Sequence, residues 1–173
     1  DQGLMDLFVK GRDYTPADLT YVIDQQHSHM ANVLPMYSQL AAAGQVELTT
    51  TPYYHPIMPL LMMDGWTFED GIRVNKDAWP DDVRTHLTNG MDLFEAELGF
   101  RPTGMWPSEQ AVSPPMVQPV TDVGIQWMVS DEEILAKSTT LGGGSSDVDD
   151  ATQLATPWIV EGDAGGGVLQ VAD

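Results

Sequence analysis

A stiff aromatic turn presents one carboxylate in the stretch GMWPSEQAVS, residues 104–113. Glu109 follows a Trp-Pro-Ser corner that begins at Trp106. The stretch is too stiff for a linker and too polar for a hydrophobic core. A carboxylate on such a turn is either a solvated loop charge or a reacting group, and this stretch alone leaves both interpretations open.

Two other segments carry groups of the same kind. Glu47 in GQVEL precedes TPYYHP, which contains His55, and Asp131 opens an acidic run after the apolar stretch IQWMVS. Aromatic rings beside carboxylates suit sugars, because the CH faces of a sugar stack on rings and its hydroxyls need acceptors. His55 is equally compatible with a structural role in a loop.

Helices are predicted before and between these segments. Thr15 is a favourable N-cap with Pro16 at the first helical position, and helical spacing of apolar residues continues over 15–43. Pro35 is expected to kink or break this helix. A second helix is predicted over 77–98.

Strands are predicted to end where the candidate side chains begin. β-Branched and apolar patterns indicate strands at 45–51, 103–106, 125–130, 157–160 and 168–171. Strands that alternate with helices and end in polar residues are typical of a parallel α/β sheet or barrel, whose loops build a site at one mouth. The acidic run 131–133 is predicted to be a turn, and 142–150 a loop excursion.

Length and composition predict one globular domain with a substantial core. The chain has 173 residues, of which 42% are hydrophobic, and it contains no cysteine. Disulfides and thiolate metal sites are therefore excluded. The sequence has no apolar run long enough to cross a membrane and no visible signal peptide, so a membrane partner is not expected.

The charge is strongly acidic and spread along the chain. Twenty-six acidic residues face seven basic ones, which gives a net charge of −19. A scattered acidic surface is favoured in a salt-rich cytoplasm, where screening removes self-repulsion, so we expect a cytoplasmic protein. Nucleic acid is not an expected partner, because the sequence has no basic stripe.

The sequence has no complete motif for a metal site or a phosphate-binding loop. His27 and His29 are two residues apart on a predicted helix and point to different faces. The acidic stretch 147–150 lacks the spacing of an EF-hand, and the GGG runs lack the lysine of a phosphate loop. We therefore predict no metal and no organic cofactor.

Two longer stretches carry a specific resemblance. Residues 44–61, GQVELTTTPYYHPIMPLL, together with 99–138, which contain WPSE, closely resemble the catalytic domain of glycoside hydrolase family 57. The likeness runs over roughly residues 11–138. The family contains α-glucan-active amylases, amylopullulanases, glucanotransferases and branching enzymes. Its second motif resembles Gly-Gln-Val-Glu here, and the nucleophile of its third motif, Trp-Pro-Ser-Glu, falls on Glu109.

The resemblance implies both a fold and a mechanism. The fold would be an incomplete seven-stranded (β/α) barrel of the distorted TIM type, with residues 1–173 forming a single partial domain of a larger catalytic domain. Glu109 would form a covalent glycosyl-enzyme on an α-glucan or maltooligosaccharide with retention, and Asp173 is the candidate acid/base. The residues expected to bind substrate are Glu47, His55, Trp106 and Asp131.

Departures from the family pattern leave alternatives open. The first and fifth motifs are absent, and the fourth is represented by VLQVAD at 168–173, so we expect the isolated chain to be inactive. A non-catalytic carbohydrate-binding or regulatory relative is one alternative. A polysaccharide deacetylase on a similar barrel is another, although its metal triad is not found. The choice between hydrolase and transferase also stays open.

Overall fold

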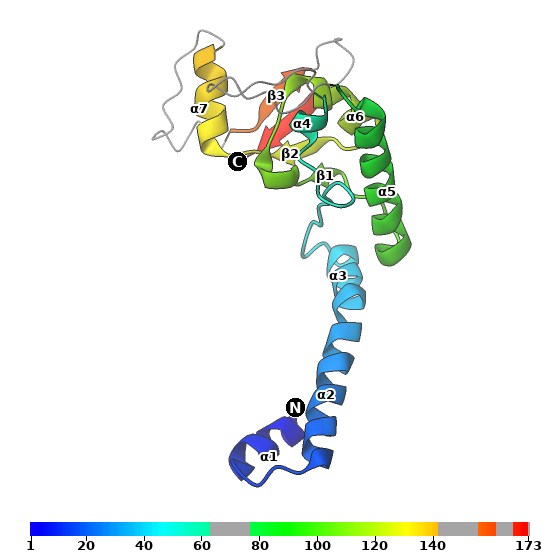
Figure 1. Cartoon of the computed structure of the whole chain (residues 1–173), viewed down its shortest axis with the longest axis vertical. Helices are drawn as coiled ribbons and strands as arrows, with labels where there is room; N and C mark the ends of the chain where they lie inside the picture. The colour runs from blue at the N-terminus through cyan, green and yellow to red at the C-terminus, as the bar shows by residue number, and fades with distance from the viewer. Residues whose placement is uncertain (63–76, 142–155, 162–167, 173) are drawn as a thin grey trace. The chain divides into compact units, whose positions relative to one another are not determined.

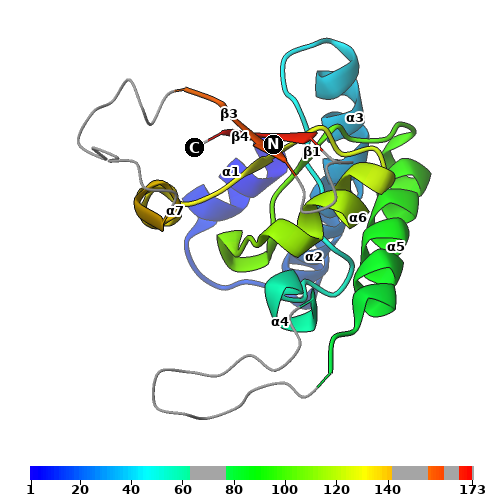
Figure 2. The ribbon, with the colours of Figure 1, turned by 90° about the horizontal axis from the view of Figure 1, so that it is seen from above.

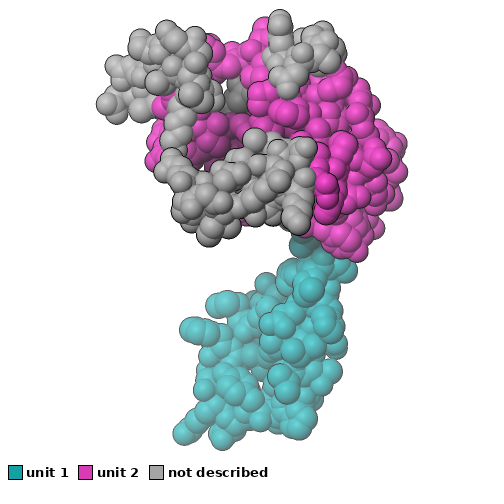
Figure 3. Space-filling view, turned by 45° about the horizontal axis from the view of Figure 1, so that its top comes forward, with its two compact units in different colours: residues 1–47 teal, residues 48–173 magenta. Residues whose placement is uncertain are grey.

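The chain forms two compact units in a computed structural model (Figures 1 and 3). They comprise residues 1–47 and 48–173. Secondary structure is described for residues 1–62, 77–141, 156–161 and 168–172. The predicted loop excursion at 142–150 and the candidate acid Asp173 lie outside these residues. That both units belong to one partial barrel domain stays a prediction.

The first unit consists of three helices. They are α1 (Gln2–Lys10), α2 (Pro16–Ala31) and α3 (Val33–Ala42). Thr15 caps α2 as predicted, and the cap is a capping box: the Thr15 side chain accepts a hydrogen bond from the Asp18 N–H, and the Asp18 carboxylate accepts one from the Thr15 N–H. The helix therefore begins where its sequence signals place it.

The predicted helix over 15–43 is divided before its proline. α2 ends at Ala31 and α3 begins after Asn32, so the break precedes Pro35 by several residues. The reason is steric, because a proline ring inside a helix clashes with the carbonyl four residues earlier, which here is that of Ala31. The end of α3 is a Schellman cap, in which Gly44 has φ 67° and the Gln45 N–H donates to the Leu40 carbonyl at 3.0 Å.

The second unit is built on a mixed four-stranded sheet. Its strands are β1 (Gly104–Met105), β2 (Trp127–Val129), β3 (Trp158–Glu161) and β4 (Val168–Ala172), in the order β1-β2-β4-β3. β1, β2 and β4 are parallel, whereas β3 pairs with β4 in antiparallel fashion. The parallel arrangement therefore holds for β1, β2 and β4, whereas β3 folds back on β4 and makes the sheet mixed.

The predicted strand at 45–51 is reduced to one paired residue. Thr50 pairs in parallel with Met105, so this segment extends the sheet beyond β1. The Thr50 N–H donates to the Gly104 carbonyl at 3.1 Å, and the Trp106 N–H donates to the Thr50 carbonyl at 2.8 Å. The ladder is short because its neighbour β1 has two residues, and because Gln45 belongs to the cap of α3.

Helices cover this sheet and contribute most of its core. They are α4 (Met58–Met62), α5 (Pro80–Leu98), α6 (Val117–Asp122) and α7 (Glu132–Leu141), with 3₁₀ turns at Ser108–Gln110 and Pro114–Met116. α5 and α6 lie side by side (Figure 2). The buried core consists of Met58, Val83, Leu87, Met91, Met105, Met116, Val117, Val120, Ile125 and Met128. Half of these are methionines, whose flexible side chains fill irregular space.

Two helix starts differ from the sequence prediction. α5 begins at Pro80 and not at Asp77, because the residue before a proline is disfavoured in helical geometry and Trp79 has φ −125° and ψ 62°. The acidic run 131–133 is not a free turn but the start of α7. The Glu133 N–H donates to Asp131 Oδ1 at 2.8 Å, so Asp131 caps a helix whose first turn favours acids.

Candidate active site

Two loops leave the same edge of the sheet side by side. One follows Thr50 and contains His55, and the other follows β1 and contains Trp106 and Glu109. Parallel pairing of Thr50 with Met105 places the carboxyl ends of the two strands together. In parallel sheets this edge is where functional loops gather.

Each loop contains two consecutive non-glycine residues with left-handed backbone. Tyr54 and His55 have φ 61° and 53°, and Glu109 and Gln110 have φ 56° and 53°. Across the part of the chain that the structure describes, five non-glycine residues have positive φ, and four of them lie here. Each such residue costs about 1–2 kcal/mol, and strain of this kind concentrates at functional sites.

Backbone hydrogen bonds hold both strained turns. The His55 N–H donates to the Pro52 carbonyl at 2.8 Å, and the Gln110 N–H donates to the Pro107 carbonyl at 2.9 Å. Pro52 and Pro107 are both buried. The two turns are therefore fixed to the folded unit and present their side chains outward.

The two turns meet through His55 and Glu109. His55 Nε2 lies 3.5 Å from Glu109 Oε1, and the two side chains are 46% and 69% exposed. On its other side, His55 Nδ1 lies 3.0 Å from Thr51 Oγ1. Glu109 thus presents a solvent-accessible carboxylate beside His55, whose other ring nitrogen is hydrogen-bonded to the Thr51 hydroxyl.

Aromatic surfaces lie in the same two loops. Trp106 is 47% exposed and Tyr54 is 84% exposed. The Tyr54 ring packs against that of Tyr53, with centroids 4.5 Å apart, and lies edge-on to His86 at 6.1 Å. Exposed rings beside an exposed carboxylate match the requirement for a sugar, which needs stacking faces and hydrogen-bond acceptors.

Helix α5 supports the loop that carries His55. The Tyr53 N–H donates to the His86 carbonyl at 3.0 Å. Gly90 of the same helix is buried, and a Cβ added to it would lie 2.9 Å from the Thr51 carbonyl oxygen and 3.2 Å from the Tyr53 nitrogen. The absence of a side chain at Gly90 therefore lets the helix approach the loop backbone closely.

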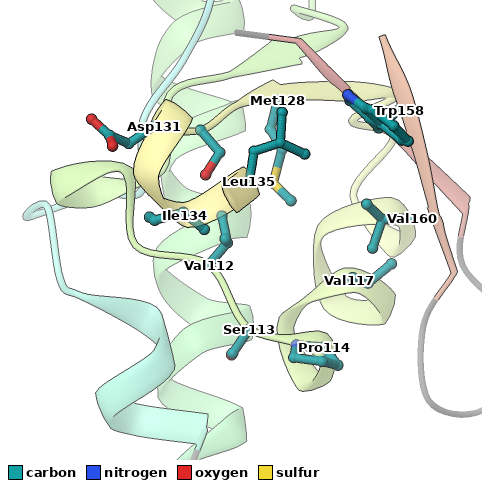
Figure 4. A pocket seen from close by; sticks show the side chains of 11 residues that line it. Val112, Ser113, Pro114, Val117, Met128, Asp131, Ile134, Leu135, Trp158 and Val160 are labelled. Carbon is teal, nitrogen blue, oxygen red and sulfur yellow. The ribbon is translucent and has the colours of Figure 1, made fainter. Parts of the chain in front are cut away.

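A separate pocket of about 280 Å³ lies beside the end of β2 (Figure 4). Asp131 belongs to its lining, whereas Glu109 does not. The lining is mostly apolar and comprises Val112, Ser113, Pro114, Val117, Met128, Ser130, Asp131, Ile134, Leu135, Trp158 and Val160. The hydroxyls of Ser113 and Ser130 are buried without a hydrogen-bond partner among the described residues.

The structure brings together three of the six predicted site residues. His55, Trp106 and Glu109 lie in the two neighbouring loops, and Asp131 follows the next strand and caps α7. Glu47 ends the first unit, so its place relative to Glu109 is not described. Asp173 lies outside the described residues, and β4, which precedes it in sequence, runs parallel to β2.

Sequence reasoning missed two residues that support the site. Thr51 was assigned to a strand, although its spacing of four residues from His55 suits a turn closed on itself. Gly90 lies inside a predicted helix, where a glycine that costs about 1 kcal/mol relative to alanine could have signalled close packing.

Among the described residues, no three histidine or acidic side chains gather closely enough to hold a metal ion. Within the same residues, no helix combines the length and apolarity needed to cross a bilayer.

Solved structures with a similar fold include a glucanotransferase, an amylase and a branching enzyme. They include the 4-alpha-glucanotransferase of Thermococcus litoralis, 19% identical with a TM-score of 0.57, for which the match covers 92% of this chain and 20% of that one. The alpha-amylase AmyC of Thermotoga maritima is 14% identical with a TM-score of 0.61 over 90% and 25% of the two chains. A branching enzyme of Thermococcus kodakaraensis is 14% identical with a TM-score of 0.62 over 97% and 32%.

These likenesses establish the fold, and the chain spans about a fifth to a third of the length of those structures. No curated protein sequence matches the chain. The family model described as Glycosyl hydrolase family 57 matches residues 10–162. This match includes both loops of the site and most of the chain, which therefore belongs to glycosyl hydrolase family 57.

Proposed function

We propose that this chain contributes the nucleophile of an enzyme that hydrolyses or transglycosylates α-glucans with retention. The observation that carries the proposal is the Glu109 carboxylate, which is 69% exposed on a strained turn and lies 3.5 Å from His55. Membership of the family and the three named α-glucan enzymes of similar fold support the choice of substrate. The proposal also includes the incomplete seven-stranded (β/α) barrel. It is supported by three parallel pairings, of Thr50 with β1, of β1 with β2 and of β2 with β4.

The proposed reaction has two steps. A Glu109 carboxylate oxygen attacks the anomeric carbon, the bond to the leaving oxygen breaks, and a second carboxyl group protonates that oxygen. Water or an acceptor sugar hydroxyl then attacks the glycosyl ester, releases Glu109 and returns its proton to the second group. Retention requires the two carboxyl groups to be about 5–5.5 Å apart.

Asp173 is the residue we propose for the second carboxyl group. It follows Ala172, the last residue of β4, and Ala172 pairs in parallel register with Val129 of β2. The carboxyl ends of β2 and β4 therefore lie at one edge of the sheet, the edge at which the Glu109 loop also leaves β1. In the same proposal Trp106 and His55 flank the sugar, and Asp131 and Glu47 contribute acceptors for its hydroxyls.

The nucleophile assignment is tested by Glu109→Gln in the full-length protein. The amide keeps the shape of the side chain but cannot form the ester, so turnover of maltooligosaccharides should fall at least about a thousandfold. Azide should partly restore turnover and yield a glucosyl azide of β configuration, because it enters from the face that Glu109 vacates. Glu132→Gln, the same exchange at an exposed acid of α7, is the matched control and should keep wild-type turnover.

Near-wild-type turnover in Glu109→Gln would refute the assignment, and so would loss of activity without any azide product. If the wild-type protein binds maltooligosaccharides but turns none over under any acceptor condition, a non-catalytic carbohydrate-binding relative would be the better conclusion. Product analysis with and without added acceptor sugars separates hydrolysis from transfer.

A further inference from the structure

We propose that Thr51 is a positioning residue that orients the nucleophile Glu109 through His55. The inference rests on the proposed function of Glu109 and adds to it a role for the hydroxyl behind the histidine. The contacts that carry it are Thr51 Oγ1 to His55 Nδ1 at 3.0 Å and His55 Nε2 to Glu109 Oε1 at 3.5 Å.

The direction of these contacts follows from what each group can donate. An ionised carboxylate accepts hydrogen bonds and donates none, so His55 can donate to Glu109 Oε1 when the two groups close up only if Nε2 carries the proton. In the neutral imidazole the other nitrogen, Nδ1, is then an acceptor. Thr51 must therefore donate its hydroxyl proton to Nδ1, and this hydrogen bond selects the tautomer of His55 that can donate to Glu109.

The backbone keeps the three groups in place. The turn from Thr51 to His55 is closed by the hydrogen bond from the His55 N–H to the Pro52 carbonyl, and the Thr51 carbonyl lies against Gly90 of α5. His55 and Glu109 each have a positive φ, a backbone conformation that few residues other than glycine adopt. Thr51 can therefore hold the ring of His55 from a fixed position.

The consequence for the reaction is a choice between the two carboxylate oxygens. Oε1 of Glu109 faces His55, which leaves Oε2 to attack the anomeric carbon. At 3.5 Å the His55 contact is longer than a hydrogen bond. Such contacts often tighten when substrate excludes water, so we expect the orientation to matter more in the transition state than in substrate binding.

Thr51→Val is the variant that tests the inference, because valine keeps the branched shape and removes the hydroxyl. In the full-length protein we expect kcat to fall about fivefold to tenfold, the size of one lost hydrogen bond, with KM changed less than about twofold. Thr51→Ser should restore kcat. Thr50→Val is the matched control, because it removes a neighbouring hydroxyl that does not contact His55, and should behave as wild type.

A double-mutant cycle separates this role from a general structural one. His55→Ala removes the group through which Thr51 acts, so Thr51→Val should have no further effect in that background. Nitrogen NMR of the imidazole gives a second readout, in which the neutral ring of wild-type His55 should carry its proton on Nε2 and Thr51→Val should lose that preference. Thermal melts verify that every variant is folded.

The outcomes distinguish this inference from the proposed function. If Glu109→Gln is inactive and rescued by azide while Thr51→Val keeps wild-type kcat, the nucleophile stands and the role of Thr51 is refuted. Additive effects of Thr51→Val and His55→Ala would refute it equally. If Glu109→Gln keeps wild-type turnover, the proposed function fails and the positioning role fails with it.

Discussion

Replacing Gly90 by alanine would push a helix against the backbone that carries His55. The added Cβ would lie 2.9 Å from the Thr51 carbonyl oxygen and 3.2 Å from the Tyr53 nitrogen. Both neighbours are backbone atoms, so no flexible side chain can move aside. The carbonyl oxygen must retreat by about 0.5 Å to reach 3.4 Å, where ordinary van der Waals contact begins.

The expected effect on stability is a difference between two terms. Alanine favours the helix over glycine by about 1 kcal/mol. Overpacking of a tight contact costs about 1–3 kcal/mol. The net change in the free energy of unfolding should therefore lie between about zero and 2 kcal/mol of destabilisation, although helix propensity alone would predict a gain.

Activity is expected to fall together with stability. Catalytic groups must be held within about 0.5 Å, and a misplacement of 1 Å can cost on the order of a hundredfold. A shift of about 0.5 Å at Thr51 is transmitted along a short turn to His55, so we expect turnover to fall about tenfold in Gly90→Ala.

The assay combines urea unfolding with maltooligosaccharide turnover by the full-length protein. Asn89→Ala is the matched control, because it places alanine at the preceding, exposed position of α5. It should be neutral or slightly stabilising and keep wild-type turnover. If Gly90→Ala is as stable as Asn89→Ala and as active as wild type, the argument that this glycine positions the His55 loop is wrong.

Three further predictions concern pH, salt and a helix end. Hydrogen bonds from Lys10 and Thr15 lower the pKa of Asp18 from 3.8 to about 2. The stabilisation of α2 by the Asp18 carboxylate is therefore complete above about pH 4 and lost as the pH falls toward 2. A carboxyl NMR titration with a midpoint near 3.8 would contradict this. With a net charge of −19, the melting temperature should be higher in molar KCl than at low ionic strength, and an equal or lower value would count against a surface adapted to salt. Gly99→Ala should lower the free energy of unfolding by about 1 kcal/mol, because Gly99 has φ 85° at the end of α5, and an unchanged urea midpoint would disprove the strain.

Local signals in the sequence predicted where individual helices and strands lie better than they predicted which strands pair with one another. The cap at Thr15 and the left-handed glycines after α3 and α5 give backbone geometry that depends on a few adjacent residues, and the structure has the Thr15 cap as expected. The antiparallel position of β3 depends on which strand it meets, and an apolar pattern of four residues is the same in either direction. The incomplete barrel remains a prediction, while the mixed sheet is observed.

The candidate site was likewise predictable only in part: a motif points to the site residues themselves but not to the residues that support them. A motif identified Glu109, His55 and Trp106, and the structure places them in two adjacent loops. The residues behind them could not be identified in this way. Thr51 acts through one hydrogen bond across a turn of four residues, and Gly90 through a close approach to a different segment, a pairing that the sequence pattern does not contain.

The strained turns connect the stability of the fold to its proposed chemistry. Glycine would adopt positive φ at the four positions without steric cost, yet none of them is glycine, and two carry the side chains that meet across the site. At about 1–2 kcal/mol each, the four residues oppose folding by roughly 4–8 kcal/mol, a large share of the 5–15 kcal/mol typical of a domain. The methionine-rich core and the contact of α5 with the His55 loop must offset that strain. We therefore expect changes that loosen the contact to let these turns relax, and activity to be lost before the fold.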